Sequence, residues 1–165
     1  MRYYTHAAIA ALAASLVPGA TPALMGVAAL GSVLPDLDHP DSFVSGRVWG
    51  RSLPARLAVG VAFRHRGFLH TLTAAAVVCA GALFAAPYLH MPHAVPYYLA
   101  FGYATHLLGD AFTGGVPLLG PFVRRWYAFA HFGVGGLVEH LVFLVCLGIL
   151  SRDLLVPMWE IVFGK

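Results

Sequence analysis

Hydrophobic residues along this chain are gathered into five segments, separated by short connections that are polar or rich in proline and glycine. The segments cover about residues 7–17, 22–34, 68–86, 95–112 and 137–150. The first two are shorter than the roughly 20 residues that a helix needs to cross a bilayer, and the break at residues 18–22 (PGATP) predicts a helical hairpin. The third segment is long enough to span, and the fourth nearly so. A last apolar piece, residues 154–163, either continues the fifth segment or lies at the membrane interface.

Composition assigns the chain to the integral membrane proteins. Its 165 residues are 59% hydrophobic and only 10% charged, with a mean hydropathy of +0.77, whereas a soluble domain is about 25% charged. The same values exclude intrinsic disorder, and two cysteines are too few for a disulfide-stapled secreted domain. The length predicts a single domain over residues 1–165. We therefore expect an all-α membrane bundle of four to five helices.

Arginine is distributed unevenly over the connections. Five arginines lie between residues 35 and 67, Arg124 and Arg125 follow the fourth segment, and the connection 87–96 has no arginine or lysine. Because positively charged connections stay in the cytoplasm, this pattern predicts a multi-pass membrane protein whose arginine-bearing connections face the cytoplasm. The connection that carries His90 and His93 would then lie outside. The possible signal-peptide cleavage site after the first segment is weak, so we expect that segment to be retained.

Most histidines and acidic residues fall at segment ends that this topology places on the cytoplasmic side. Nine histidines and seven acidic residues are many for so apolar a chain, and ionisable side chains are costly in a bilayer. Their gathering at one face therefore predicts a functional site there. The candidate metal ligands are His6, Asp36, Asp38, His39, His65, His70, His106, Asp110 and Glu139.

The spacing of these residues suits metal binding. His106 and Asp110 are four residues apart in an apolar segment, so both project from one helix face and can bind one ion. Asp36 and Asp38 share a proline-bounded extended turn in which both carboxylates can point at one centre, and His70 stands at the start of the third segment. Mixed imidazole and carboxylate ligands favour Zn, Mn or Fe(II) over Ca or Mg. Their number suits two ions roughly 3.5–4 Å apart, as in hydrolytic two-metal sites.

Each of these features alone also has an ordinary structural explanation. A histidine in an apolar helix is usually a hydrogen-bonded packing residue, and aspartates favour turns and helix caps. Glu139 is either a ligand or a charge at a helix N-terminus. The three clusters together favour the metal site, while His90 and His93 are interpreted as solvated loop residues. No nucleophile elbow, phosphate-binding loop or zinc-ribbon cysteine pattern occurs in the sequence.

Four stretches of the sequence carry a family resemblance. They are residues 34–42 (LPDLDHPDS), 65–71 (HRGFLHT), 102–110 (GYATHLLGD) and 113–121 (TGGVPLLGP). In order and spacing they resemble the YdjM-like family of inner-membrane-associated, metal-dependent hydrolases, over most of the chain from His6 to Glu139. That family is distantly similar to zinc-dependent phospholipase C and P1-type nucleases, which also use a helical His-x-x-x-Asp pair. The resemblance implies metal-dependent hydrolysis without naming a substrate.

We therefore expect a hydrolase bound to the bacterial inner (plasma) membrane that acts on a phosphoester, such as that of a lipid or a lipid-linked compound, through a water activated by two Zn ions. Asp38 is the candidate general base, and Arg66 the candidate residue for orienting the phosphate. Membrane lipids are the expected partners, and nucleic acid is not. The alternative is a non-enzymatic membrane protein with a structural or sensory metal site. A transporter is disfavoured because the ionisable residues gather at one face instead of along the depth of the bundle.

Overall fold

The protein is a small helical bundle, described here by a computed structural model that covers residues 1–38, 47, 66–123 and 125–163. For Asp38 and residues 153–163 only the backbone is described. His39 and His65 lie outside the described residues. The helices are α1 (Tyr3–Ser15), α2 (Pro22–Gly31), α5 (Leu72–Ala85), α6 (Ala94–Thr113) and α7 (Leu137–Phe163), with 3-10 turns η1 (Pro35–Asp38) and η2 (Phe68–His70). The described residues contain two isolated β-bridges and no strand, so the all-α class is confirmed.

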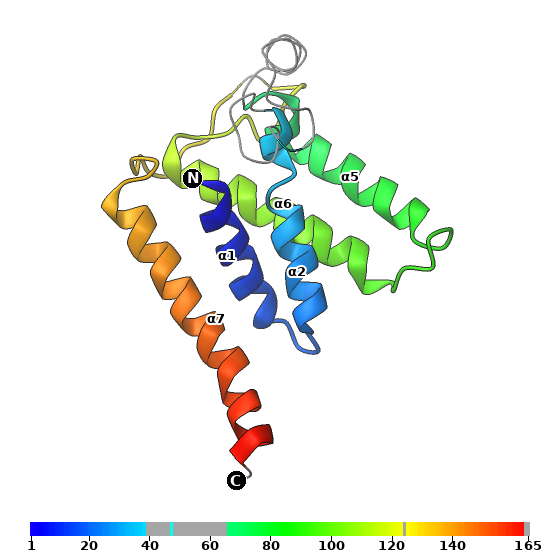
Figure 1. The fold of residues 1–165 in the computed structure, drawn as a ribbon. Helices are drawn as coiled ribbons and strands as arrows, with labels where there is room; N and C mark the ends of the chain where they lie inside the picture. Colours follow the sequence, from blue (N-terminus) through cyan, green and yellow to red (C-terminus); the bar gives the residue numbers. More distant parts are fainter. Residues whose placement is uncertain (39–46, 48–65, 124, 164–165) are drawn as a thin grey trace.

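Helix α6 lies at the centre of this arrangement. It packs against α1, α2 and α5, while α7 packs against α1 (Figure 1). Alanines make the contact between the first two helices close, because Ala10, Ala14 and Ala28 are all fully buried there. Alanine is also the best helix former, which lets these short segments stay helical. The start of α1, the end of α2, the start of α5 and the end of α6 consequently meet at one end of the bundle (Figure 1).

Two glycines set how closely α2 and α6 cross. A Cβ atom at Gly102 would lie 1.8 Å from the carbonyl oxygen of Ala28, and one at Gly31 would lie 2.1 Å from that of Leu99. Both distances are far inside van der Waals contact, so only glycine is accommodated at these positions. Small residues that let helix backbones touch are typical of membrane helix pairs. This crossing brings the end of α2 beside the middle of α6, where the carbonyl of Ser32 reaches His106.

The predicted segments match the helices unevenly. The fourth segment was predicted at 95–112 and is α6, and the fifth continues without a break as α7 to Phe163. The third segment does not form a helix from residue 68, because Phe68–His70 is a 3-10 turn and the Thr71 side chain caps α5 by accepting from Ala74 N. Its helix has 14 residues, so the spanning length expected for it is not found. Across the described residues, no helix combines the length and the apolar character that a bilayer crossing requires.

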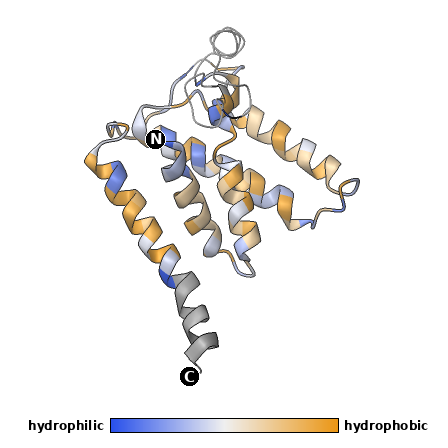
Figure 2. Cartoon of the chain, in the orientation of Figure 1, coloured by the Kyte–Doolittle hydropathy of each residue, from blue (hydrophilic) through white to orange (hydrophobic). Residues whose placement is uncertain are grey.

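Hydrophobic side chains nonetheless cover much of the outside of the bundle. Figure 2 shows them along α5 and α7, the two helices at its edges. On α7, Leu137, Leu141, Leu144 and Val145 are each more than half exposed. Most of the buried polar side chains lie instead at the end where α1, α2, α5 and α6 meet. The chain is therefore polar inside and apolar outside at that end of the bundle.

Candidate metal centre

Five ionisable side chains from four elements meet at this end of the bundle. They are His6 from α1, Asp36 from η1, His70 from η2, and His106 and Asp110 from α6. All are buried except Asp36, which is partly exposed. The turn η1 is 3-10 rather than extended as expected, but it still directs Asp36 toward α6. The structure thus brings together five of the nine predicted ligands.

The carboxylate of Asp110 is at the centre of the cluster, and its two oxygens face different imidazoles. Its Oδ1 lies 3.2 Å from Nε2 of His6. Its Oδ2 lies 3.6 Å from Nε2 of His70 and 3.7 Å from Nε2 of His106. The i, i+4 spacing of His106 and Asp110 therefore does what the sequence predicted, since both side chains project from α6 into one site.

Two further cationic groups contact Asp110. The amino group of Met1 donates to Oδ1 at 2.8 Å, and it also donates to Oγ1 of Thr113 at 3.1 Å. The guanidinium Nε of Arg66 lies 3.3 Å from Oδ2. A buried carboxylate is very unfavourable without such partners. In this arrangement the negative charge of Asp110 is balanced by the amino group of Met1, which precedes α1, and by the guanidinium of Arg66.

A main-chain contact orients the ring of His106. Its Nδ1 lies 2.6 Å from the carbonyl oxygen of Ser32, which can only accept, so Nδ1 carries the proton and donates it. In the neutral ring Nε2 is then unprotonated and presents its lone pair to the cluster. This Nε2 lies 3.2 Å from Nε2 of His70 and 3.9 Å from Oδ1 of Asp36. Metal-binding histidines are commonly oriented by a carbonyl in just this way.

His6 is buried, although its ring nitrogens lack hydrogen-bond partners among the described residues. It stacks on His106 with ring centroids 3.8 Å apart, and it lies against Gly109, where a Cβ atom would come within 3.1 Å of its Cε1. Within the described part of the chain, neither ring nitrogen of His6 makes a hydrogen bond of acceptable geometry. Buried polar atoms in folded proteins nearly always have a partner. An unsatisfied imidazole facing a carboxylate is therefore an observation that a bound cation would explain.

Asp36 adds a second carboxylate to the same cluster. Burial is the main cause that raises its pKa; nearby His6 opposes this effect, and the negative charge of Asp110 adds to it. A raised pKa favours the protonated, uncharged form of this carboxyl group. Asp36 thus adds a second source of oxygen atoms beside the imidazoles of the cluster.

The ligand atoms form two overlapping groups of suitable size. His6, His106 and Asp110 offer one atom each, all within 4.8 Å of one another, and so do Asp36, His70 and His106. Imidazole nitrogens and carboxylate oxygens in groups of three are the donor sets of Zn, Mn and Fe sites. The residues present therefore fit a divalent transition metal, and His106 belongs to both groups.

Arg66 lies at the edge of this cluster and is partly exposed. Its Nη1 donates to the carbonyl oxygen of Gly115 at 3.1 Å. The neighbouring Gly114 ends α6 with a φ of 151°, and a Cβ atom there would lie 2.6 Å from Nη1 of Arg66. Glycine is thus needed at this position both for its backbone conformation and for the room that it leaves to the guanidinium.

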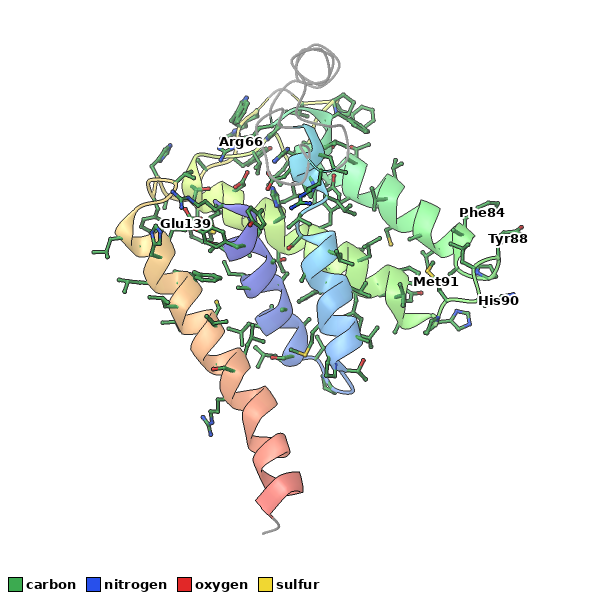
Figure 3. All side chains as sticks on the ribbon, viewed as in Figure 1. Arg66, Phe84, Tyr88, His90, Met91 and Glu139 are labelled. Carbon is green, nitrogen blue, oxygen red and sulfur yellow. The ribbon has the colours of Figure 1, made fainter. Side chains whose placement is uncertain are left out.

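Of the remaining predicted ligands, Glu139 does not join the cluster, and the other three fall outside the described side chains. Both oxygens of Glu139 accept backbone N–H groups, from Arg2 and from Gly135, each at 2.5 Å, and Glu139 belongs to neither ligand group (Figure 3). It ties the start of α7 to the start of α1, one turn before His6. The side chain of Asp38, and the residues His39 and His65, are not described. His90 lies at the opposite end of the bundle (Figure 3), and His93 is exposed beside it in sequence.

Sequence reasoning missed the groups that shape the site without binding through a side chain. They are the carbonyl of Ser32 and the glycines Gly31, Gly102 and Gly109. Gly102 and His106 are four residues apart on α6, so a glycine one turn before the histidine was the available signal.

Comparison with known proteins now identifies the family. The family model described as YdjM inner membrane protein matches residues 1–163. The chain belongs to this family. Inner membrane protein YdjM of Escherichia coli (strain K12) is 41% identical over 106 residues, which cover 60% of this chain and 48% of that protein, and the same values hold for the protein of that name from Shigella flexneri. The chain spans about half the length of these curated relatives. No solved structure matches it significantly.

Proposed function

We propose that this member of the YdjM family is a membrane-associated, metal-dependent hydrolase that acts on a phosphoester. The observation that carries the proposal is that five buried or partly buried side chains from four elements place their ligand atoms in two groups of three. Asp110 would be a ligand through the carboxylate that faces His6 and His106. Hydrolytic two-metal sites hold their ions about 3.5–4 Å apart.

The proposed metal is Zn, with Mn or Fe as alternatives, and the proposed number of ions is two. Bound ions of this kind lower the pKa of a coordinated water, which supplies hydroxide near neutral pH. His106 would be a ready ligand because Ser32 holds its proton on Nδ1. Because only Nε2 of His106 has a free lone pair, this ring would bind one of the two ions, together with either His6 and Asp110 or Asp36 and His70. The remaining pair would contribute to holding the second ion.

Two residues are proposed for the chemistry around the ions. The guanidinium of Arg66, fixed on Gly115, is suited to orient a phosphate oxygen because it is partly exposed and adjacent to Asp110. Asp38 stands two residues after Asp36 in the turn η1. We propose that its carboxylate takes a proton from the attacking water.

We place the protein in the inner membrane because its family is described by that location and its outer surface is apolar. The cytoplasmic position of the site follows only from the arginine distribution and rests on the positive-inside rule.

A structural or sensory metal site is the second candidate, and the burial of the ligands favours it. His6, His70 and His106 are almost fully buried, and structural sites are usually closed to solvent whereas catalytic sites keep an open position. A metal that joined α1, η1, η2 and α6 would stabilise a bundle of short helices.

The test begins with elemental analysis of detergent-purified protein after reconstitution with Zn or Mn, for the wild type, Asp110→Asn and the control His90→Ala. We expect about two ions per chain in the wild type and the control, and a clear loss in Asp110→Asn. The metal-loaded proteins are then given a soluble chromogenic phosphoester. Hydrolysis that is lost in Asp110→Asn supports the enzyme. Bound metal without hydrolysis, together with a large fall in melting temperature on chelation, supports the structural site. Absence of metal in the wild type would overturn both.

A further inference from the structure

The connection between α6 and α7, residues 114–136, exposes an unusual number of large hydrophobic side chains. We call it the aromatic loop. Phe122 is 84% exposed and Phe129 is 64% exposed. The other exposed members are Leu119, Val123, Trp126, Phe132 and Val134. Exposed apolar side chains concentrated in one connection favour a contact with a membrane or a protein partner.

Backbone hydrogen bonds hold this loop against the end of α6. The amide of Phe129 donates to the carbonyl of Ala111 at 2.8 Å, and the amide of Phe132 donates to that of Phe112 at 3.1 Å. Val116 and Tyr127 also exchange both hydrogen bonds of a bridge. The side chains are therefore exposed although the backbone of the loop is well paired.

The charge of the loop favours a lipid surface as its partner. No aspartate or glutamate occurs between Asp110 and Glu139, while Arg125 is exposed with its guanidinium 5.7 Å from the ring of Tyr127. Aromatic rings prefer the headgroup layer of a bilayer, and arginine is attracted there by anionic lipids. A loop with these residues and no carboxylate complements a negatively charged membrane surface.

The aromatic loop is also connected to the candidate metal centre. Gly115, near its start, accepts the hydrogen bond from Arg66, and Arg66 contacts Asp110. Gly115 and Arg66 thus link the aromatic loop to the candidate ligand Asp110. A loop in the headgroup layer would hold the cluster at the depth where the phosphates of lipids lie.

We propose that the aromatic loop lies in the headgroup layer of an anionic bilayer, and that the site takes its phosphoester from a lipid of that bilayer instead of from water. The first half of this inference stands on the loop alone, and the second half rests on the hydrolase function proposed above. Two measurements separate them.

The first measurement gives the depth of the loop. Trp126 is exposed in the loop, and replacing the other two tryptophans (Trp49→Phe, Trp159→Phe) leaves it as the single reporter. The protein is reconstituted into vesicles of phosphatidylethanolamine and phosphatidylglycerol that carry a spin-labelled quencher either at the headgroup or near the bilayer centre. We expect strong quenching by the shallow label and weak quenching by the deep one. No quenching by either, or stronger quenching by the deep label, would overturn the proposed position.

The second measurement compares substrates in the metal-loaded protein. Phe122→Ser with Phe129→Ser removes two exposed rings of the loop, and Phe84→Ser with Tyr88→Ser removes two similarly exposed rings at the opposite end (Figure 3). We expect the loop variant to lose about tenfold in hydrolysis of lipid phosphate in vesicles, because each ring contributes binding to the bilayer. Its hydrolysis of the soluble phosphoester should stay unchanged, and the control should keep both activities.

The outcomes distinguish the two proposals. Loss of lipid hydrolysis alone supports the inference. Equal rates on lipid phosphate in wild type and loop variant, with soluble hydrolysis intact, overturn it and leave the hydrolase standing. If the metal-loaded wild type hydrolyses neither substrate, the hydrolase function fails and the lipid substrate with it, whereas the depth measurement still decides the position of the loop.

Discussion

At one end of the bundle His6, His70 and His106 are buried around Asp110, and at the other end His90 and His93 are exposed on the turn between α5 and α6 (Figure 3). Both groups lie close to helix ends in an apolar chain. The buried rings face carboxylates and one another, and their burial is costly unless a partner satisfies them. The exposed rings are satisfied by solvent. Histidine content alone therefore does not mark a site; what distinguishes the two ends is whether four elements converge on the same rings.

The largest effect on the buried cluster is expected from a substitution that forces α2 and α6 apart. In Gly102→Leu the new side chain meets the backbone of Ala28, so the helices must separate, and Ser32 moves away from His106. We expect a loss of about 3 kcal/mol or more in the free energy of unfolding, together with loss of bound metal. Thermal unfolding in detergent and elemental analysis measure the two effects.

Gly81→Ala on α5 is the matched control, because nothing lies within 4 Å of its new Cβ atom. Alanine is a better helix former than glycine by about 1 kcal/mol, so this variant should be as stable as the wild type or slightly more. If Gly102→Leu unfolded at the wild-type temperature with full metal content, the close crossing would not be what assembles the cluster.

Glu139→Ala tests the hydrogen bonds that join the start of α7 to the start of α1, at the end of the bundle that holds the cluster. Glu139 itself belongs to neither ligand group. Its removal leaves the backbone amides of Arg2 and Gly135 without their carboxylate, which should cost about 2 kcal/mol of stability. Glu139→Gln keeps one acceptor oxygen and should lose less. We expect only a small fall in metal affinity, which would arise if α1 and its His6 shift slightly. Isothermal titration of the purified variants with Zn measures this affinity. A complete loss of metal in Glu139→Gln would instead place this residue among the ligands.

Replacing one histidine of the buried cluster tests whether its ring binds a metal ion. His6→Ala should weaken metal binding by more than about 10- to 100-fold, which is the loss seen when only a hydrogen-bonding partner of a metal ligand is removed. Competition with a chromogenic chelator gives the affinity. Equal affinity in wild type and variant would mean that His6 is a packing residue, as its stacking on His106 also allows.

The smallest effect is expected at the far end. His90→Ala with His93→Ala should leave metal content unchanged and alter the free energy of unfolding by less than about 0.5 kcal/mol, since both side chains are exposed. A loss of metal in this variant would show that exposed histidines of the turn also bind the ion, and the difference between the two ends would disappear.

The sequence predicted the parts of this structure that depend on long apolar patterns. Helix α6 was placed within one residue at each end, because apolar residues predominate from Val95 to Phe112 and Gly114-Gly115 follows. Helix α5 was predicted four residues too early, since Phe68 and Leu69 are as apolar as the helix that follows and only the capping hydroxyl of Thr71 marks its start. Apolar composition alone does not separate a 3-10 turn from the first turn of a helix.

The sequence predicted the side chains that gather at the site. It did not predict the backbone groups and glycines that position them. The convergence of His6, Asp36, His70, His106 and Asp110 followed from their placement at segment ends. The tight crossing at Gly102 could not be predicted, because a glycine in an apolar helix has no unique meaning without knowledge of its neighbour. The ligand role of His39 and His65 stays a prediction, since both lie outside the described residues.

The contact between Ser32 and His106 has a consequence for anyone who compares or redesigns such sequences. The acceptor is a peptide oxygen, so any residue at position 32 that keeps the backbone path supplies it equally well. Substituting the serine side chain tests nothing about the histidine, and an alignment column at this position would carry no trace of the interaction. The tautomer of His106 is thus set by a backbone oxygen, whose position depends on how closely α2 and α6 cross.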